Sequence, residues 1–349
     1  MSATTIKPGR PWEPTAKERG QKALNLLIAV AISFVLLFVT GLNGKLGWVA
    51  AFFFSYVSVS FIAEYRRAGK PAAQDSLLTS ISRFAIFLAI IPIVSILATV
   101  ISKGWRGLHW GLFTQDMSEA TVNSPIQEGG MLAAIVGTLI MVGLALLFTL
   151  PIAILTALYL TEIKGKFARP IRVLVQAMSG VPSIVAGLFI LSSIVYPVTG
   201  ERSGLMGALA LSILMIPTVA RTAEEVLLLI PNDLREAGLA LGATQWRTVA
   251  MVVVPAVKSG LVTAIILGIA RVIGETAPIL LVSGGGDATN FNPVSGPMGS
   301  IPFYVWNAFL LGGSEESTQR TWAGLLVLLL WVLILFTIAR YISSRSQKR

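Results

Sequence analysis

Long apolar runs separated by short polar connections dominate the order of side chains along the chain. Most runs reach the length, about 20 residues, that an α-helix needs to cross a bilayer, and a helix is the only single segment that pairs its own backbone groups in lipid. We therefore predict an all-α membrane protein, a polytopic helical bundle of about eight transmembrane helices. The predicted spans cover residues 23–42, 47–63, 82–101, 131–160, 171–197, 205–220, 257–282 and 322–341.

The composition supports this class, because 54% of the 349 residues are hydrophobic and only 13% are charged. A water-soluble domain of this composition would carry more apolar side chains than its core could bury. The chain has no cysteine, which excludes disulfides, thiolate metal sites and thiol nucleophiles. Its one histidine, His109, lies in a polar loop, where an interfacial role is favoured over catalysis. We expect neither a metal nor a cofactor.

Basic residues divide the connections into two groups. If the N-terminus is inside, 21 of the 27 lysines and arginines lie in inner segments and five in outer segments, which leaves Arg271 within a span. Cytoplasmic loops of membrane proteins collect basic residues in this way. We therefore place both termini in the cytoplasm. The net charge of +10 has the same origin, so it does not indicate a nucleic-acid partner.

The longest inner connection, about residues 221–257, has the pattern of a small folded element. Pro231 ends one apolar stretch, and Asn232 or Asp233 can cap the helix that follows. Gly242 stands where a glycine-dependent turn would lead into a second helix. We predict a compact cytoplasmic knob, a shape that a groove in a partner protein would bind.

The same connection resembles the EAA loop of ABC-transporter permeases, which docks into the nucleotide-binding ATPase. Gly238 stands where the family usually has its second alanine, and Val252 and Val254 replace the usual isoleucine and leucine. These departures keep the size and polarity similar. The residues that carry the motif are Glu236, Ala237, Gly238, Gly242 and Pro255.

Four further stretches resemble the phosphate-specific ABC permeases, and "GETAP" is closer to the PstA subfamily than to PstC. The resemblance covers about residues 80–345 in the family's order, so residues 81–349 are predicted to form an ABC permease transmembrane domain. Residues 1–80, a cytoplasmic tail and two extra helices, depart from the usual six-helix pattern. The stretches are "PIAILTALYLTE" (151–162), "GVPSIVAGLF" (180–189), "ALGATQWRT" (240–248) and "RVIGETAP" (271–278).

This resemblance implies a permease subunit of an ATP-driven phosphate importer, multi-pass in the plasma membrane of a prokaryote. Its partners would be a second permease resembling PstC, two copies of a cytoplasmic ATPase resembling PstB, an extracytoplasmic phosphate-binding protein, and membrane lipid. The chain has no G-x-x-x-x-G-K-[ST] loop and no catalytic motif, so we expect it not to be an enzyme. A separate ATPase chain would hydrolyse the ATP.

Arg271 and Glu275 are two charges in a run that is otherwise apolar from Ser259 to Val282. Each charge would cost on the order of 3 kcal/mol near the centre of a bilayer, so neither should face lipid. Their i, i+4 spacing lets them neutralise each other, and a guanidinium offers a planar fork of donors that matches phosphate oxygens. We predict that Arg271, Glu275 and Thr276 line the substrate pathway; an internal ion pair that locks the bundle is the structural alternative.

Three other functions stay open at this stage. A permease for sulfate, molybdate or phosphonate would share the coupling loop. A secondary transporter or channel would also carry buried charges but would not need that loop. A non-transporting regulatory membrane protein is the third possibility.

Overall fold

The structure is a computed structural model that describes residues 16–41 and 44–346. Within these ranges the chain is helical, with one isolated bridge between Gly284 and Met298 and no strand. The helices are α1 (Ala16–Thr40), α2 (Lys45–Gly104), η1 (Trp105–Gly107), α3 (Trp110–Thr114), α4 (Leu132–Leu158), η2 (Tyr159–Ile163), α5 (Ala168–Ser179), α6 (Ser183–Ile190), η3 (Leu191–Thr199), α7 (Gly204–Leu228), α8 (Asn232–Ala240), α9 (Gln245–Thr248), η4 (Val249–Val253), α10 (Val254–Ala256), α11 (Lys258–Val272), α12 (Ala277–Val282), α13 (Ile301–Leu311) and α14 (Glu315–Ser346).

Five of these helices are long and apolar enough to cross a membrane, or seven if each of two bent helix pairs counts as one span. The all-α membrane class is therefore confirmed, whereas the count of eight stays a prediction. The chain divides into two compact units, residues 1–97 and 98–349. The functional boundary predicted near residue 80 also stays a prediction. The predicted cytoplasmic tail, as far as Thr15, lies outside the described residues.

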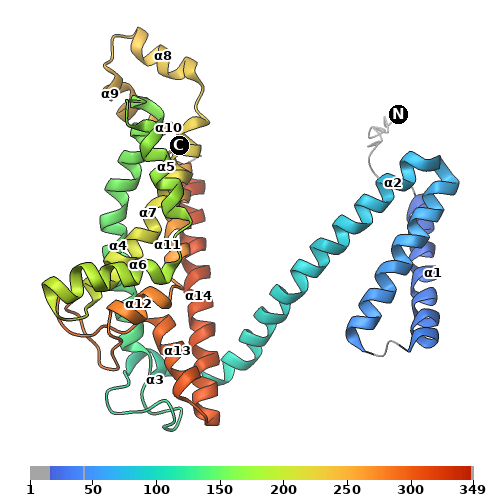
Figure 1. Cartoon of the computed structure of the whole chain (residues 1–349), viewed down its shortest axis with the longest axis horizontal. Coiled ribbons are helices and arrows are strands. Elements are labelled where there is room, and N and C mark those ends of the chain that lie inside the picture. Colours follow the sequence, from blue (N-terminus) through green and yellow to red (C-terminus); the bar gives the residue numbers. More distant parts are fainter. Residues whose placement is uncertain (1–15, 42–43, 347–349) are drawn as a thin grey trace, which may run out of the picture. The chain divides into compact units, whose positions relative to one another are not determined.

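The N-terminal unit contains α1 and most of α2, which reverses direction along its length (Figure 1). Gly69 has φ 81° and ψ −171°, a non-helical conformation that glycine adopts without steric cost, and it separates α2 into two arms. The arms contact each other through Phe53 and Phe84, whose ring centroids lie 4.1 Å apart. Phe34 of α1 packs edge-on against Trp48 of the first arm.

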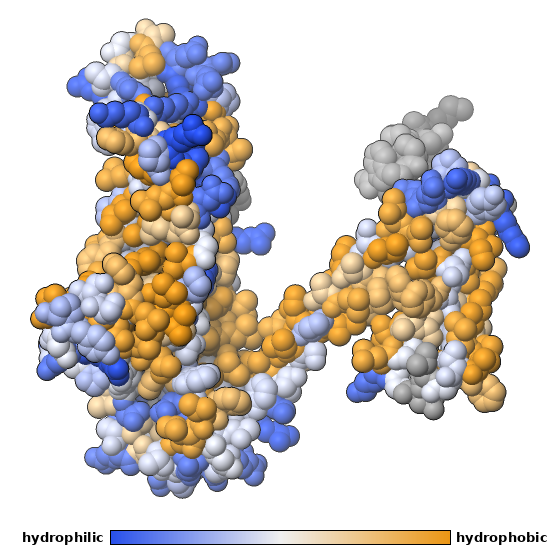
Figure 2. Space-filling view, viewed as in Figure 1, coloured by the Kyte–Doolittle hydropathy of each residue, from blue (hydrophilic) through white to orange (hydrophobic). Residues whose placement is uncertain are grey.

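The second unit is built around α7, which packs along α4 on one side and α11 on another. Small side chains allow this close approach: Ala145 of α4 and Ala208 of α7 are fully buried, and Gly268 of α11 lies against Val219. Met141 and Met215 fill the remaining space in the same core cluster. Figure 2 shows apolar surface over the middle of this unit and polar surface at both ends, the pattern of a membrane-embedded bundle.

Two predicted continuous spans are broken. The prediction for residues 171–197 is wrong because α5 meets the segment Ser183–Thr199 at 104°, with Pro182 at the break. A proline disfavours helical conformation in the residue before it, here Val181. The prediction for 257–282 is wrong because α11 ends at Val272 and α12 starts at Ala277, after the segment that contains Gly274.

The fourth predicted span, residues 131–160, is too long for one straight crossing of a bilayer. Its length predicts a kink at Pro151 or an extension beyond the bilayer. Pro151 lies inside α4, and the helix continues into the π-helical turn η2, so that the apolar helix runs for 32 residues from Leu132 to Ile163. At 1.5 Å per residue this is about 48 Å, longer than a bilayer's hydrocarbon core of about 30 Å. The helix is therefore longer than one straight crossing needs, as predicted, and Glu162 lies in its last turn.

Candidate functional site

The charged pair of the "RVIGETAP" stretch lies at the break between α11 and α12. Arg271 occupies the last turn of α11, and its Nη1 donates a hydrogen bond to Oε1 of Glu275. The backbone N–H of Glu275 donates to the carbonyl of Val272 at 3.1 Å, which holds the carboxylate just past the helix end. The predicted i, i+4 contact therefore forms although the helix does not continue through it.

Arg271 is far from saturated with hydrogen bonds. Its side chain is 46% exposed and that of Glu275 only 11%, and Glu275 is the one hydrogen-bond partner that Arg271 has within the described residues. A guanidinium carries five donors. Thr276, the third predicted pathway residue, is half-buried next to this pair. Arg271 lies 13 residues beyond Lys258, about 20 Å along the helix.

The backbone after the break is held by a close helix contact. A Cβ on Gly187 of α6 would lie 2.7 Å from Cα of Pro278, so only glycine lets α6 approach α12 here. The contact joins the "GVPSIVAGLF" and "RVIGETAP" stretches, which the sequence showed separately. It fixes the position of α12 and thus of the residues that precede it.

The predicted knob is present at the far end of α7. α8 is followed by a turn at Gly242, whose φ of +80° is the left-handed conformation that glycine favours, and Thr244 caps α9 by accepting from the N–H of Arg247. One detail of the prediction is wrong: Pro231 is the N-cap of α8, with no side-chain cap. Asn232 does not cap because its Oδ1 instead accepts from Arg235 Nη1 at 3.4 Å.

The motif residues occupy distinct positions on the knob. Glu236 and Ala237 are exposed on α8, and Pro255 is exposed on α10, just before the chain bends by 73° into α11. Gly238 is buried, and a Cβ there would lie 2.6 Å from Cγ2 of Thr248. Thr248 therefore fills the space that the methyl group of the family's usual alanine would occupy at position 238.

Large apolar side chains cover the outside of the knob. Leu241 is 90% exposed, Met251 74% and Trp246 65%, among polar and charged neighbours. Large apolar side chains that are exposed among polar ones are typical of interaction surfaces. The knob thus has the chemistry of a docking surface for another protein.

An ion pair that sequence reasoning missed anchors the knob to α4. Glu162 in η2 accepts from Nε and Nη2 of Arg235 at 2.9–3.2 Å, and the two side chains are only 6% and 18% exposed. Arg235 also donates to the carbonyls of Leu227 and Ile230, at 2.9 and 2.6 Å, the first in the last turn of α7 and the second two residues beyond its end. Gln245 of α9 donates to the carbonyl of Glu162 at 2.6 Å. We call Glu162, Arg235 and Gln245 the clamp.

A second inner ion pair fastens α5 to α7. Nε and Nη2 of Arg172 donate to Oε1 of Glu224 at 2.9 and 2.8 Å. Glu224 is buried although it sits in an otherwise apolar face of α7. Its charge is matched by Arg172, which is half exposed at the surface.

The outer end of the second unit is fixed by another missed residue. Arg320 of α14 is fully buried, and its Nη2 donates to the carbonyls of Ser124, Pro125 and Glu128 at 3.1, 2.8 and 2.7 Å. In this way one guanidinium organises the loop that follows α3. His109 caps α3 by accepting from the N–H of Leu112, and burial followed by the charge of Arg320 lowers its pKa.

Asp116 joins this loop to the segment after α12. Its Oδ2 accepts from the N–H and the hydroxyl of Thr289, both at 2.9 Å, and its Oδ1 accepts from Ser118. These hydrogen bonds, that of the Ser118 hydroxyl most strongly, lower the pKa of Asp116 to about 2. Asp116 is therefore ionised at physiological pH.

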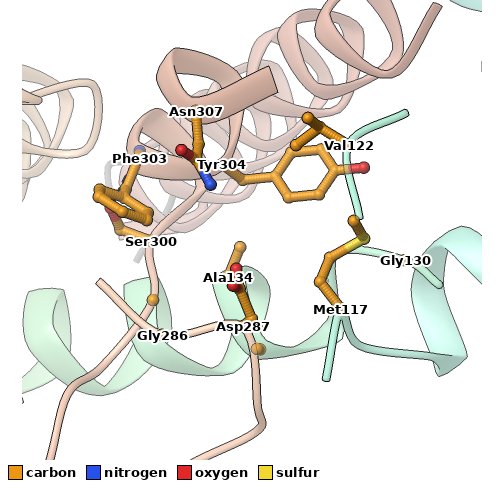
Figure 3. A pocket seen from close by; sticks show the side chains of 12 residues that line it. Met117, Val122, Gly130, Ala134, Gly286, Asp287, Ser300, Phe303, Tyr304 and Asn307 are labelled. Atoms are coloured by element: carbon orange, nitrogen blue, oxygen red, sulfur yellow. Dashed lines mark hydrogen bonds between the residues drawn. The ribbon is translucent and has the colours of Figure 1, made fainter. Parts of the chain in front are cut away.

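Figure 3 shows a cavity between these outer loops and α13. Tyr304, Met117 and Asp287 point toward one another across it, but its volume is about 20 Å³, enough for about one water molecule. It cannot hold a substrate. The cavity is a packing feature of the outer end.

Comparison with known proteins agrees with these features. Residues 149–348 match the family described as "Binding-protein-dependent transport system inner membrane component". The chain is 34% identical over 281 residues to "Phosphate transport system permease protein PstA 1" of Mycobacterium tuberculosis (strain ATCC 25618 / H37Rv), covering 79% of this chain and 90% of the relative. It is 35% identical over 278 residues to "Phosphate transport system permease protein PstA" of Pasteurella multocida (strain Pm70), covering 79% and 96%.

A solved structure shares the fold. The "MetNI methionine ABC transporter" in an inward facing conformation aligns with a TM-score of 0.51 at 19% identity, over 61% of this chain and 93% of that one. An identity this low supports the fold alone. The family match and the curated relatives show that the chain belongs to the binding-protein-dependent transport system inner membrane components, the permease family of ABC importers.

Proposed function

We propose that the chain is the permease subunit of an ATP-driven phosphate importer in the inner membrane of a prokaryote. With a second permease resembling PstC it forms the transmembrane pathway for inorganic phosphate. The names of the relatives support the substrate. The observation that carries the proposal is Arg271, an exposed guanidinium at the break between α11 and α12 whose one partner, Glu275, leaves most of its donors free.

The pathway chemistry follows from this pair. The guanidinium of Arg271 is a planar fork that can donate to two phosphate oxygens at once. Glu275 orients the guanidinium when the pathway is empty and repels the anion when it arrives. Thr276 supplies a hydroxyl beside them. Binding stays weak, as a conduit requires.

Coupling to ATP resides in the knob. Its exposed leucine, tryptophan and methionine side chains dock one of two copies of an ATPase resembling PstB, which hydrolyses the ATP on a separate chain. Glu236, Ala237, Gly238, Gly242 and Pro255 shape the docking surface. The clamp then ties movement of α8 to α4, because Arg235 and Gln245 are both bound to Glu162.

Phosphate reaches the pathway from an extracytoplasmic phosphate-binding protein. The outer loops that Arg320 and Asp116 hold together form the surface that this protein meets. Selectivity among oxyanions belongs mainly to the binding protein, so Arg271 needs only to pass the anion. A permease for sulfate, molybdate or phosphonate is the competing proposal.

Uptake in a strain that lacks the gene tests this function. Cells that express the chain with its partners should take up radiolabelled phosphate and not sulfate or molybdate. Arg271→Lys should reduce uptake about tenfold or more while the complex still assembles, because lysine keeps the charge and loses the fork. The matched control Arg106→Lys, an exposed arginine outside the break, should transport normally. Uptake of sulfate in place of phosphate would overturn the substrate assignment.

A further inference from the structure

Polar side chains gather between α1 and the two arms of α2, inside the otherwise apolar N-terminal unit. They line a cavity of about 60 Å³. Five of them carry hydroxyl groups, and Ser60 and Ser80 among these are buried. The hydroxyl residues are Tyr56, Ser60, Ser76, Thr79 and Ser80. We call this cavity the N-terminal polar pocket.

The hydroxyls of this pocket are not used by the protein itself. Elsewhere in α1, Ser33 and Thr40 donate to carbonyls four residues earlier, both at 2.6 Å. The five pocket hydroxyls make no hydrogen bond to any other described residue, and neither does Asn25 of α1, which lines the same cavity. A half-buried polar group without a partner is costly in an apolar setting. The pocket therefore offers unused hydrogen-bonding groups to a ligand.

The charges at the pocket favour an anion. Lys22 of α1 and Arg83 of the second arm of α2 lie exposed at its edge, and neither has an ion-pair partner within the described residues. The one acidic residue of the lining, Glu64, lies 3.9 Å from Arg67 and is partly neutralised by it. The arms of α2 are joined by a connection that is itself basic.

The side of the membrane on which the pocket lies favours one kind of anion. Lys22 comes just before the apolar run of α1, Glu64 just after the first run of α2, and Arg83 at the start of the next. Lys22 and Arg83 therefore both precede apolar runs on the side that the basic connections assign to the cytoplasm. The contact between Phe53 and Phe84 places Arg83 deeper between the arms than Glu64. Basic pockets between transmembrane helices on that side bind the phosphate groups of anionic lipids.

We propose that the N-terminal polar pocket binds the phosphate group of an anionic phospholipid from the inner leaflet. Arg83 and Lys22 hold the phosphate oxygens, and the hydroxyls and Asn25 donate to the remaining oxygens. At about 10–15 Å³ per water, the cavity has room for about four waters, close to the five heavy atoms of a phosphate group. This role belongs to the N-terminal unit and is independent of the transport function.

Native mass spectrometry of the full-length chain tests the proposal, with phosphatidylglycerol, phosphatidylcholine and inorganic phosphate as separate probes. The parent should retain phosphatidylglycerol in preference to phosphatidylcholine. Lys22→Gln with Arg83→Gln should weaken that retention about tenfold or more, because two charge-assisted contacts are lost. Thr79→Val, which keeps the shape and removes one hydroxyl, should weaken it by a smaller factor.

The matched control is Arg66→Gln with Lys70→Gln, which removes two charges from the same side of the membrane but not from the pocket lining. It should retain the lipid as the parent does. Equal loss in both double variants would overturn the proposal in favour of general attraction to the basic connection. Displacement of the lipid by millimolar inorganic phosphate would overturn the lipid as the source and assign the pocket to the free ion. Gel filtration of each variant separates loss of binding from loss of folding.

Discussion

Two arginine–glutamate pairs in the second unit differ in how much of the arginine is already used. Arg235 is 18% exposed and donates to Glu162, to Asn232 and to two carbonyls, one in the last turn of α7 and one just beyond it. Arg271 is 46% exposed and donates to Glu275 alone among the described residues. The first guanidinium is committed to holding the structure, whereas the second keeps donors available for a ligand.

This difference separates structural from functional charges better than position in the sequence does. Both pairs lie next to family motifs, and in the sequence both are charged residues beside apolar runs. The carbonyls of Leu227, in the last turn of α7, and of Ile230, just beyond that helix, both accept from Arg235. Arg271 lies where α11 ends before α12, and it donates to no backbone carbonyl within the described residues. A structural requirement of this kind therefore does not explain Arg271.

The largest expected effect is on stability, and it distinguishes the pairs. Arg235→Leu leaves the buried carboxylate of Glu162 without a partner, which should lower the free energy of unfolding by about 3 kcal/mol or more. Arg271→Leu should cost less, because the Arg271 side chain is 46% exposed and donates to no backbone carbonyl within the described residues. Thermal unfolding of the two variants in the same detergent measures the contrast. Equal losses would mean that both pairs are structural locks.

The second largest expected effect is on the coupling of ATP hydrolysis to phosphate import. Gly242→Val places a β-branched side chain at φ +80°, which should cost about 1–2 kcal/mol locally and distort the knob. No atom lies within 4 Å of the Cβ position, so the effect comes from backbone conformation and not from a clash. ATP hydrolysed per phosphate imported should rise, with normal membrane insertion. An unchanged ratio would contradict the coupling role, and Ala243→Val serves as the control.

Removal of the N-terminal extension should have a smaller effect, because neither pair lies in it. A chain that starts near Gln74 keeps the six-span core and the charge bias of the remaining connections. It should insert in the same orientation, assemble with its partners and import phosphate. Assembly is checked by co-purification with the second permease. Failure to assemble would show that the first two helices are part of the structural core.

The smallest effect concerns pH at the outer end. Burial and Arg320 lower the pKa of His109 below its ordinary 6.5, so the unfolded chain binds this proton more readily than the folded one. The stabilising effect of the neutral ring is complete above pH 6.5 and is lost as pH falls below it. The melting temperature of the parent should therefore drop more between pH 7 and 5 than that of His109→Asn, which caps without titrating. Identical pH profiles would exclude this role.

Sequence reasoning predicted the structural features that depend on local chemistry. The apolar runs, the positive φ of Gly242 and the contact between Arg271 and Glu275 all depend on residues close in the chain. The clamp joins residues 73 positions apart and Arg320 meets carbonyls nearly 200 positions away, so no spacing rule could pair them. The breaks at Pro182 and Gly274 were missed because an apolar run shows length and does not show where a backbone turns.

The central claim is that Arg271 is kept to pass phosphate and not to lock the bundle. The double variant Arg271→Leu with Glu275→Leu tests it most directly, because it removes both charges and both desolvation costs together. Reconstituted with its partners, it should assemble and unfold at about the parent's temperature while phosphate uptake falls about a hundredfold or more, as expected when the charge-assisted contacts to the anion are lost. Uptake close to that of the parent would contradict the claim and leave the pair as a structural lock.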